Sequence, residues 1–238
     1  MNNIKTLENK NVLITGASGG LGKSLCKKFE NCNANIYAMG RDEGKLNELS
    51  SEYKIKNYYC CNLSAIQEIK EAHKNILKDS GGIDILINNA GLFEKSSLEE
   101  IDDDLIRKIF SINVFAPIIL TKLFSRNMKE NMWGRIFNIG SSSAYNGGEL
   151  TSLYCSSKHA LLGFSRSMSK ELHDYKIRVC NISPSSIKTN MGKIPLSTYQ
   201  DFNTFLDPDE IAEVVVFLSS FDSTMEFKEI ALNRFDIQ

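Results

Sequence analysis

The stretch Asn11-Val12-Leu13-Ile14-Thr15-Gly16-Ala17-Ser18-Gly19-Gly20-Leu21-Gly22 places a short apolar run directly before a glycine-rich turn. Consecutive apolar residues are typical of a parallel strand that is buried on both faces. Beyond the turn, Leu21, Leu25 and Phe29 recur at the spacing of a helix. A strand, a glycine-rich turn and a helix in this order predict a phosphate-binding site. Glycines let backbone N–H groups approach an anion, and the helix N-terminus favours negative charge.

The same turn also resembles another phosphate-binding motif, the P-loop. Gly22-Lys23-Ser24 resembles the end of the P-loop of nucleoside triphosphatases, which reads G-x-x-x-x-G-K-[ST]. That motif requires a glycine at position 17, where this chain has Ala17, and Gly16 lies one residue too early. The sequence therefore disfavours a nucleotide triphosphatase. The glycine spacing also departs from the G-x-G-x-x-G fingerprint of other dinucleotide-binding folds.

The rest of the chain alternates short apolar runs with longer helical patterns. Further strands are predicted at residues 35–39, 56–61, 83–88, 135–139, 178–182 and 229–232. Apolar residues between them recur at helical spacing, as in Ile66, Ile69, His73 and Ile76, and in Leu161, Phe164, Met168 and Leu172. This alternation predicts an α/β fold, a doubly wound Rossmann domain with a parallel sheet of about seven strands and helices on both faces. No linker or repeat interrupts it, so we expect residues 1–238 to form a single domain.

Composition excludes several classes of partner. The chain has 238 residues, of which 28 are basic and 29 acidic, and its formal net charge of −1 gives no electrostatic reason to bind nucleic acid or an anionic membrane. No apolar run approaches the ~20 residues that span a bilayer, and residues 1–10 are polar, so we expect a cytoplasmic protein. The six cysteines form no C-x-x-C pair and suit no metal site, which indicates free thiols in a reducing compartment.

Tyr154 and Lys158 lie four residues apart in a predicted helix, which puts them on one face. A free tyrosine has a pKa of roughly 10, too high for efficient proton transfer near neutral pH. A nearby cation favours the phenolate and lowers that pKa. Such a pair is common by chance on amphipathic helices, so by itself it indicates little.

Taken together, six separated motifs resemble the short-chain dehydrogenase/reductase family, in the family's order and over nearly the whole chain. They are Thr15 to Gly22 (T-G-x-x-x-G-x-G), Asn88 to Gly91 (N-N-A-G), Asn113, Ser141, the Tyr154 and Lys158 pair (Y-x-x-x-K), and Pro184 to Thr189, similar to P-G-x-x-x-T. The chain departs from the family where Asn62-Leu63 replaces an aspartate and where Ser185 replaces a glycine. It also lacks the glycine pair that often ends family members.

The resemblance implies an NAD(P)-dependent oxidoreductase with four catalytic residues. Tyr154 would be the general acid in reduction and the general base in oxidation, and Lys158 would lower its pKa and bind the nicotinamide ribose. Ser141 would donate a hydrogen bond to the substrate carbonyl, with Ser142 and Ser143 as alternatives. Asn113 would anchor a water that links Lys158 to solvent. Tyr145 is expected in the pocket wall.

The resemblance also implies a set of cofactor-binding residues: Gly16, Ser18, Gly20, Leu21, Gly22, Arg41, Asn62, Leu63, Asn89, Ala90, Gly91, Tyr154, Lys158, Pro184, Ile187 and Thr189. NADP(H) is favoured over NAD(H), because Gly40 offers no carboxylate for a ribose 2′-hydroxyl and Arg41 could pair with a 2′-phosphate. Asp42 would either cap the next helix or oppose that phosphate. No metal is expected.

Substrate specificity is expected between Thr189 and Pro208, a short segment with apolar residues at Met191, Ile194, Leu196, Tyr199 and Phe202. The chain resembles 3-oxoacyl-carrier-protein reductase-like members of the family. A β-ketoacyl thioester is therefore the leading substrate class, while small ketones, aldehydes, sugars and pterins stay open. Family resemblance implies a homodimer or homotetramer formed through the helices of Asn113 and Tyr154. A non-catalytic NADP(H)-binding sensor or scaffold is the alternative function. His73, His159 and His173 are expected at the surface or its boundary.

Overall fold

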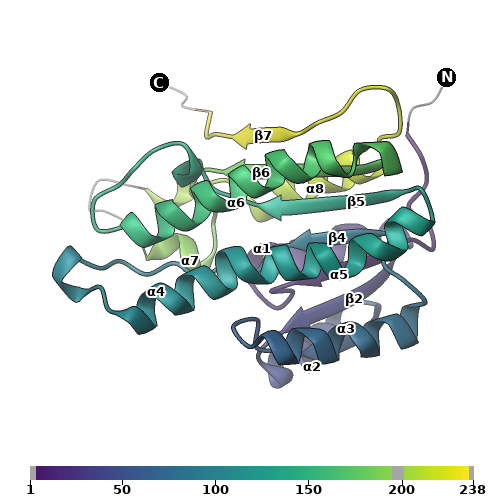
Figure 1. Ribbon diagram of the computed structural model, residues 1–238, viewed down its shortest axis with the longest axis horizontal. Coiled ribbons are helices and arrows are strands. Elements are labelled where there is room, and N and C mark those ends of the chain that lie inside the picture. Colours follow the sequence, from purple (N-terminus) through teal and green to yellow (C-terminus); the bar gives the residue numbers. More distant parts are fainter. Residues whose placement is uncertain (1–3, 195–200, 236–238) are drawn as a thin grey trace.

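The computed structural model describes residues 4–194 and 201–235, and it is built around one parallel sheet. Its seven strands lie in the order β3-β2-β1-β4-β5-β6-β7. They are β1 (Asn11–Thr15), β2 (Asn35–Gly40), β3 (Ile55–Cys60), β4 (Ile85–Asn88), β5 (Gly134–Ile139), β6 (Ile177–Pro184) and β7 (Glu229–Leu232). Figure 1 shows the carboxyl ends of these strands on the left, where α4 protrudes from the body.

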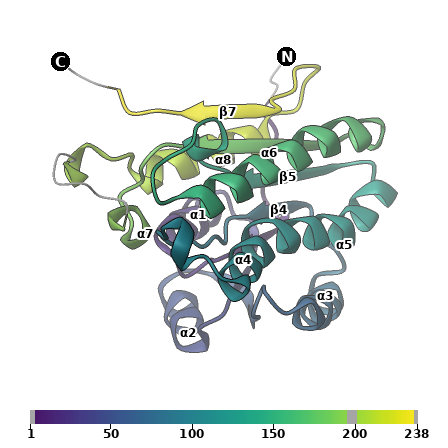
Figure 2. The same cartoon turned by 60° about the vertical axis from the view of Figure 1, so that its left-hand side comes forward.

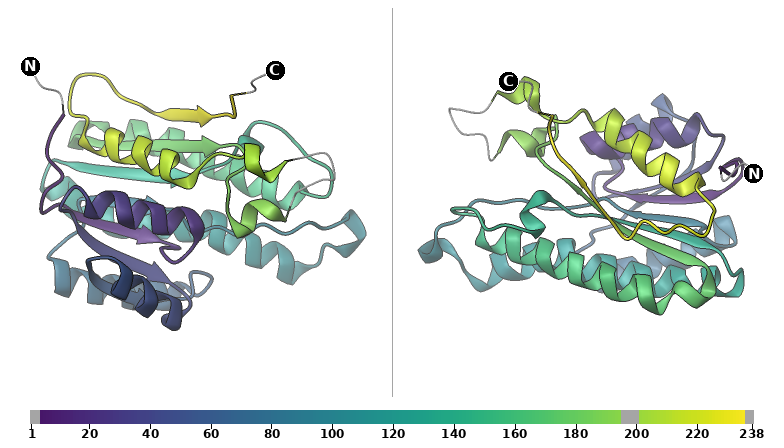
Figure 3. Two further views of the ribbon diagram at one scale, coloured as in Figure 1. Left: turned by 180° about the vertical axis from the view of Figure 1, so that it is seen from behind. Right: turned by 90° about the horizontal axis from the view of Figure 1, so that it is seen from above.

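Helices cover both faces of the sheet. They are α1 (Gly20–Glu30), α2 (Glu43–Glu52), α3 (Ile66–Ser80), α4 (Asp103–Phe110), α5 (Ala116–Glu130), α6 (Ser152–Glu171), α7 (Asn190–Lys193) and α8 (Pro208–Ser220). Short 3-10 turns occupy Leu98–Glu100, Ser142–Ala144, His173–Tyr175 and Phe202–Thr204, and a π-helical turn, Ser111–Phe115, joins α4 to α5. In Figure 2, α3, α5 and α6 lie over one face, whereas the view from behind in Figure 3 shows α1 and α8 over the other.

The central strands are buried on both faces because alternate side chains enter two separate cores. On β1, Val12 and Ile14 pack with α1 and α8, while Leu13 packs with α3 and α5. All three side chains are fully buried. This arrangement explains why the strands read as continuous apolar runs rather than as alternating patterns.

The segment Asp103–Glu130 runs from α4 through the π-helical turn into α5 and passes a length and hydropathy test for a membrane span. The sequence did not indicate such a segment, because polar residues interrupt its apolar ones. Half of its most apolar window is buried inside the protein. Leu120 and Phe124 pack in the core between α5 and α3, so we interpret the segment as a core helix.

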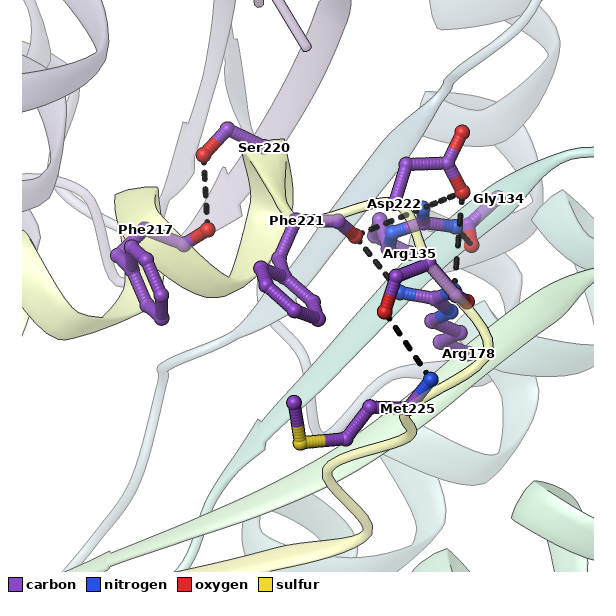
Figure 4. A network of polar contacts seen from close by, with 9 residues as sticks. Gly134, Arg135, Arg178, Phe217, Ser220, Phe221, Asp222 and Met225 are labelled. Atoms are coloured by element: carbon purple, nitrogen blue, oxygen red, sulfur yellow. Dashed lines mark hydrogen bonds and ion pairs between the residues drawn. The ribbon is translucent and has the colours of Figure 1, made fainter. Parts of the chain in front are cut away.

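A polar network closes the opposite end of the sheet (Figure 4). Arg135 on β5 is 1% exposed, donates to the backbone carbonyl of Phe221 at 3.3 Å, and pairs with Asp222 at 3.3 Å. Arg178 on β6 donates to the same carbonyl at 2.7 Å and lies 3.6 Å from Asp222. Trp133 stacks on Arg135, with 4.4 Å between the guanidinium carbon and the ring centre. The network fixes the end of α8 to the two strands.

The predicted fold class is confirmed, with small corrections. The fourth strand begins at Ile85 rather than at residue 83, and β6 extends to Pro184. Ile66, which was placed in an apolar helical stripe, is 50% exposed at the first position of α3. The single-domain organisation of residues 1–238 stays a prediction, and the shared sheet agrees with it.

Candidate active site

The glycine-rich turn after β1 is packed too tightly for side chains at two positions. Gly16 has a φ of +61°, and a Cβ there would lie 2.9 Å from Ala90 Cα. A Cβ on Gly22 would lie 2.2 Å from the carbonyl oxygen of Gly16, so α1 starts in direct contact with the turn. Gly16 holds the backbone in a shape that L-residues rarely adopt, whereas Gly22 is required because a side chain there would collide with the turn. Lys23, the residue of the rejected P-loop motif, pairs instead with Glu52 at 3.4 Å.

The segment after β4 is joined to this turn by hydrogen bonds. The hydroxyl of Thr15 accepts from the backbone N–H groups of Asn89 and Ala90, each at 3.0 Å. The amide of Asn89 donates to the carbonyls of Thr15 at 2.9 Å and Gly16 at 3.2 Å. The glycine-rich turn and the Asn88 to Gly91 motif therefore meet at the carboxyl edge of β1 and β4.

The N-terminus of α1 fits a bound phosphate. Its N-cap is Gly19, no side chain caps it, and no acidic residue occupies its first turn. By contrast, Asp42, Asp102 and Asp207 cap α2, α4 and α8 with side-chain oxygens. Free backbone N–H groups at a helix N-terminus form an anion site. The pyrophosphate of a dinucleotide thus fits the residues present at Gly19 to Gly22.

The end of β2 supplies one free cation. Arg41 is exposed and forms no ion pair with any residue in the described part of the chain. The carboxylate of Asp42 accepts from the backbone N–H of Lys45 at 3.0 Å and lies 3.5 Å from its ammonium. The hydrogen bond from the Lys45 backbone is the main cause that lowers the pKa of Asp42. Asp42 is therefore the predicted helix cap.

Asn62 and Leu63, which follow β3, do not present a free side-chain oxygen to a ligand. Asn62 is one of the predicted cofactor-binding residues, and the atom with which it would bind a ligand is its amide oxygen. That oxygen already accepts from the backbone N–H and the hydroxyl of Ser64, at 3.1 and 2.8 Å. The neighbouring Leu63 is 9% exposed and packs in the core. The local Asx turn explains the difference, because a short amide side chain readily bonds to the backbone two residues on.

Lys158 is deeply buried beneath the site. It is 4% exposed, and its ammonium donates to the backbone carbonyl of Ile139 at 2.8 Å. The ammonium lies 5.7 Å from the centre of the Tyr154 ring, which confirms that the two side chains share one face of α6. Burial lowers the pKa of Lys158 to about 8. A Cβ on Gly91 would lie 3.7 Å from this ammonium, so the segment after β4 closes over it.

Tyr154 on α6 is hydrogen-bonded to Ser141, which follows the end of β5. Burial raises the pKa of Tyr154, and a side-chain hydrogen bond with Ser141 opposes that rise. The edge of the Phe93 ring packs against the phenol, with 4.8 Å between ring centres. Lys158 was expected to set the pKa of Tyr154, but burial is the largest influence on that pKa in the structure. Of Ser141, Ser142 and Ser143, Ser141 is the one that hydrogen-bonds to the phenol, and its catalytic role stays a prediction.

Asn113 lies in the π-helical turn and is 1% exposed. Its oxygen accepts from the backbone N–H of Leu92 at 2.8 Å. Its two N–H groups donate to the Leu92 carbonyl at 2.9 Å and to the Ser157 hydroxyl at 3.0 Å. The amide thus ties the segment after β4 to α6. Because both donors are used inside the protein, the predicted water contact stays a prediction.

The segment after β6 closes over the glycine-rich turn. A Cβ on Gly20 would lie 2.6 Å from the methyl group of Thr189, and the Thr189 hydroxyl caps α7 by accepting from Gly192 N–H at 3.1 Å. Ser185 occupies the family's glycine position without a positive φ, so the replacement causes no backbone strain. Its hydroxyl is buried without a partner among the described residues. Ile187 pairs with Leu206 in an isolated bridge at the base of the substrate segment.

The predicted substrate lining is placed only in part. Met191 and Ile194 are 39% and 51% exposed, and Phe202 packs on Phe205 at 5.4 Å. Leu196 and Tyr199 lie outside the described residues. Tyr145, which was expected in the pocket wall, instead donates from its phenol to Glu229 on β7. Sequence reasoning also missed Phe93 and Ile139, since an apolar residue and a backbone carbonyl carry no motif.

Comparisons with known proteins agree with this geometry. The family model described as "short chain dehydrogenase" matches residues 10–198. The chain is 32% identical to a 3-oxoacyl-[acyl-carrier-protein] reductase FabG of Rickettsia conorii, covering 90% of each chain. It is 31% identical to carbonyl reductase family member 4 of Xenopus tropicalis, covering 86% of this chain and 89% of the relative.

Solved structures share the fold. A short-chain type dehydrogenase/reductase from Mycobacterium marinum superposes with a TM-score of 0.87 at 25% identity, covering 95% of both chains. The structure of gox2181 gives a TM-score of 0.88 at 20% identity, covering 97% of this chain and 96% of the other. At this identity the similarity shows a shared fold and nothing more. With the matched family model and the relatives above 30% identity, the chain belongs to the short-chain dehydrogenase family of oxidoreductases.

Proposed function

We propose that the protein is an NADP(H)-dependent reductase that interconverts a carbonyl group and a secondary alcohol. The observation that carries this proposal is the meeting of Ser141, Tyr154 and Lys158 at the carboxyl edge of the sheet, next to the uncapped N-terminus of α1. A dinucleotide-binding sensor or scaffold would not need these three side chains together. The glycine turn, Asn89 to Gly91 and Pro184 to Thr189 would hold the cofactor.

Each catalytic side chain has one task. A nicotinamide cofactor held by these residues would supply or accept the hydride. The hydroxyl of Ser141 donates a hydrogen bond to the carbonyl oxygen, where negative charge develops. Tyr154 transfers its phenolic proton to that oxygen during reduction and recovers it during oxidation. Lys158, held by the Ile139 carbonyl, places positive charge beside the phenol and favours its ionised form.

The same residues support a preference for NADP(H). Gly40 has no side chain to contact a ribose hydroxyl, and a Cβ there would already lie 3.3 Å from Leu46. Arg41 is exposed and without an ion pair in the described residues, so it is available to a 2′-phosphate. Asp42 does not cancel this cation, because its carboxylate is engaged by Lys45.

Equilibrium titration with NADPH and NADH tests the preference. Arg41→Ala should weaken NADPH binding about 10- to 100-fold, the loss expected for one hydrogen bond to a charged group. NADH binding should change little. Arg126→Ala is the matched control, because Arg126 is an exposed arginine on α5 that, among the described residues, pairs with Glu130 of its own helix alone. Tighter binding of NADH than NADPH by the unmodified protein would contradict the preference.

The favoured substrate class is a β-ketoacyl thioester. It rests on the similarity to the Rickettsia 3-oxoacyl-[acyl-carrier-protein] reductase and on the apolar side chains of Met191, Ile194 and Phe202 in the substrate segment. Other relatives are named diacetyl reductase and L-xylulose reductase, so small ketones and sugars are the competing substrates. An NADPH-oxidation screen over acyl thioesters, diketones, ketoses and aldehydes decides among them.

Tyr154→Phe is the control for that screen. Loss of the phenol should reduce turnover at least ~10²-fold, the usual contribution of a positioned acid, while NADPH still binds. A variant with full turnover would refute the assignment of Tyr154 as the proton donor. If no substrate class supports turnover by the unmodified protein while NADPH binds, the alternative of a cofactor-binding sensor takes its place.

We further infer a homodimer or homotetramer and a cytoplasmic location. Helices α5 and α6 lie side by side on one face in Figures 1 and 2. Ile106 of α4 and Phe115 of the π-helical turn before α5 are 37% and 49% exposed, and Ala160 and Gly163 of α6 are exposed small residues that allow close approach. Light scattering after size exclusion tests the assembly, and Phe115→Glu should shift it toward the monomer.

A further inference from the structure

The turn that carries Ser141 is a compact unit with its own internal hydrogen bonds. The hydroxyl of Ser141 accepts from Ser143 N–H at 3.1 Å, and its carbonyl accepts from Ala144 N–H at 2.9 Å. Tyr145 N–H closes the turn on the Ser142 carbonyl at 3.1 Å. Because the bonds link each end of the turn to the other, a shift of Tyr145 is passed to Ser141.

The phenol of Tyr145 fastens this turn to the edge of the sheet. It donates to a carboxylate oxygen of Glu229 on β7 at 2.5 Å and lies 3.3 Å from the hydroxyl of Ser183 on β6. A hydrogen bond between a phenol and a carboxylate is charge-assisted and is stronger than one between neutral groups. Burial and the bond to Glu229 both raise the pKa of Tyr145, so the phenol stays protonated and donates at physiological pH.

Glu229 makes a second contact on the helix that carries the acid. Its other oxygen accepts from the guanidinium of Arg166 on α6 at 2.9 Å. One carboxylate therefore links the Ser141 turn, the strand β7 and the helix of Tyr154. The β7 strand itself is held by its pairing of Asn181 with Glu229. No other carboxylate in residues 4–194 and 201–235 bonds to the 141–145 turn.

We propose that Tyr145 and Glu229 are positioning residues, whose hydrogen bond holds the Ser141 turn at the distance from Tyr154 that the reaction requires. The inference rests on the proposed reductase function, since it concerns how two of its catalytic residues are kept together. A loose turn would leave the binding of the cofactor intact, because the glycine-rich turn and Arg41 belong to other strands. It would weaken the contact of Ser141 with the phenol.

The proposal predicts a pH effect that a merely structural contact would not produce. The hydrogen bond from Ser141 lowers the pKa of Tyr154 against the effect of burial. The other titratable groups beside this phenol are Lys158 and Cys155 of its own helix. Glu229 and Arg166 face Tyr145 and not Tyr154. Loss of the Tyr145 bond should therefore raise the pKa of Tyr154.

The test compares Tyr145→Phe, Glu229→Gln and the double variant. Each single variant should reduce kcat for reduction about ten-fold, since small misplacements of reacting groups cost this much or more. KM for NADPH should stay within about two-fold. The double variant should match Glu229→Gln alone, because that change already removes the carboxylate to which Tyr145 donates. The pH at which alcohol oxidation rises should move upward by ~0.5 unit or more. Thermal unfolding confirms that each variant is folded.

Tyr53→Phe is the matched control, because the Tyr53 phenol donates to the Glu52 carboxylate at 2.6 Å on α2, remote from the Ser141 turn. It should change neither kcat nor the pH profile. Wild-type kcat and pH profile in Tyr145→Phe, or additive losses in the double variant, would overturn the proposal. Ultraviolet titration of the phenol, with Tyr154→Phe backgrounds subtracted, reports the Tyr154 pKa without turnover. It therefore tests the proposal even if the reductase function fails.

Discussion

The ammonium of Lys158 donates a hydrogen bond to the backbone carbonyl of Ile139 at 2.8 Å and has no carboxylate partner in the described residues. Burial alone lowers its pKa from 10.5 to about 8. A buried cation without a carboxylate partner lowers the stability of the fold, so we attribute Lys158 to the chemistry of the site rather than to the stability of α6.

Lys158→Met should stabilise the fold while abolishing turnover. The lowered pKa corresponds to about 3 kcal/mol of unfavourable burial at neutral pH, and the lost bond to Ile139 offsets about 1 kcal/mol of the gain. Urea unfolding at pH 7 measures the difference. The folded lysine loses its proton above a pKa of about 8, whereas the unfolded lysine keeps it up to a pKa of ~10.4. The free energy of unfolding of the wild type should therefore rise relative to that of the variant as the pH increases from about 8 toward 10. A variant less stable than wild type at pH 7 would contradict this account.

Gly22→Ala should destabilise the protein by about 2 kcal/mol or more, because its Cβ would lie 2.2 Å from the Gly16 carbonyl and neither backbone can move freely. NADPH affinity should fall as well, since the same contact shapes the turn. Gly44→Ala in α2 is the matched control. Its Cβ meets Asp42 at an ordinary 3.5 Å, and a gain of roughly 0.5–1 kcal/mol is expected from helix propensity. Chemical denaturation of both variants checks the contrast.

At the far end of the sheet, Asp222→Asn should cost more stability than Arg135→Met. Asp222 is the shared partner of Arg135 and Arg178, so its loss leaves two facing guanidinium groups, one of them fully buried. We expect a loss of about 2–3 kcal/mol. Removing Arg135 leaves Asp222 paired with Arg178, and the cost should stay under about 1 kcal/mol. Equal losses in the two variants, measured by urea unfolding, would show that the network is not organised around Asp222.

His73 should make the fold sensitive to mild acid. Burial lowers its pKa, its Nε2 has no hydrogen-bond partner in the described structure, and its ring packs on Phe124 at 5.0 Å. The unfolded histidine binds a proton below ~6.5 while the folded one resists it, so stability falls as pH drops through that value. His73→Leu should flatten the fall between pH 7 and pH 5. His173→Leu, at an exposed position, should leave it unchanged.

The strands were predictable because burial on both faces leaves a continuous apolar run, as at Val12 to Ile14. The glycine turn and the Asp42 cap were predictable because few residue types satisfy those backbone shapes. The contacts of side chains were not. Spacing of four residues placed Lys158 beside Tyr154, but it could not tell that burial would dominate both pKa values.

Other features carry no local signal at all. The π-helical turn at Ser111–Phe115 interrupts a helix of ordinary composition, so no residue pattern indicates it. The direction of the Tyr145 side chain depends on Glu229, which lies 84 residues further along the chain. Asn62 bonds to Ser64 instead of a ligand because a neighbour two residues away competes successfully for its oxygen. Each of these outcomes depends on partners that only the folded chain brings together.

The pairing of β1 with β4 has a consequence for folding. Val12 lies beside Ile85, and every strand after β4 adds outward from this junction. The sheet therefore becomes continuous only when β1 pairs with the distant strand β4, and closing the loop between these two strands is a slow step of folding. The glycine-rich turn and the Asn89 segment meet at the same junction. A dinucleotide bound there would hold the early and late halves of the chain together, so it would slow unfolding as well as serve the reaction.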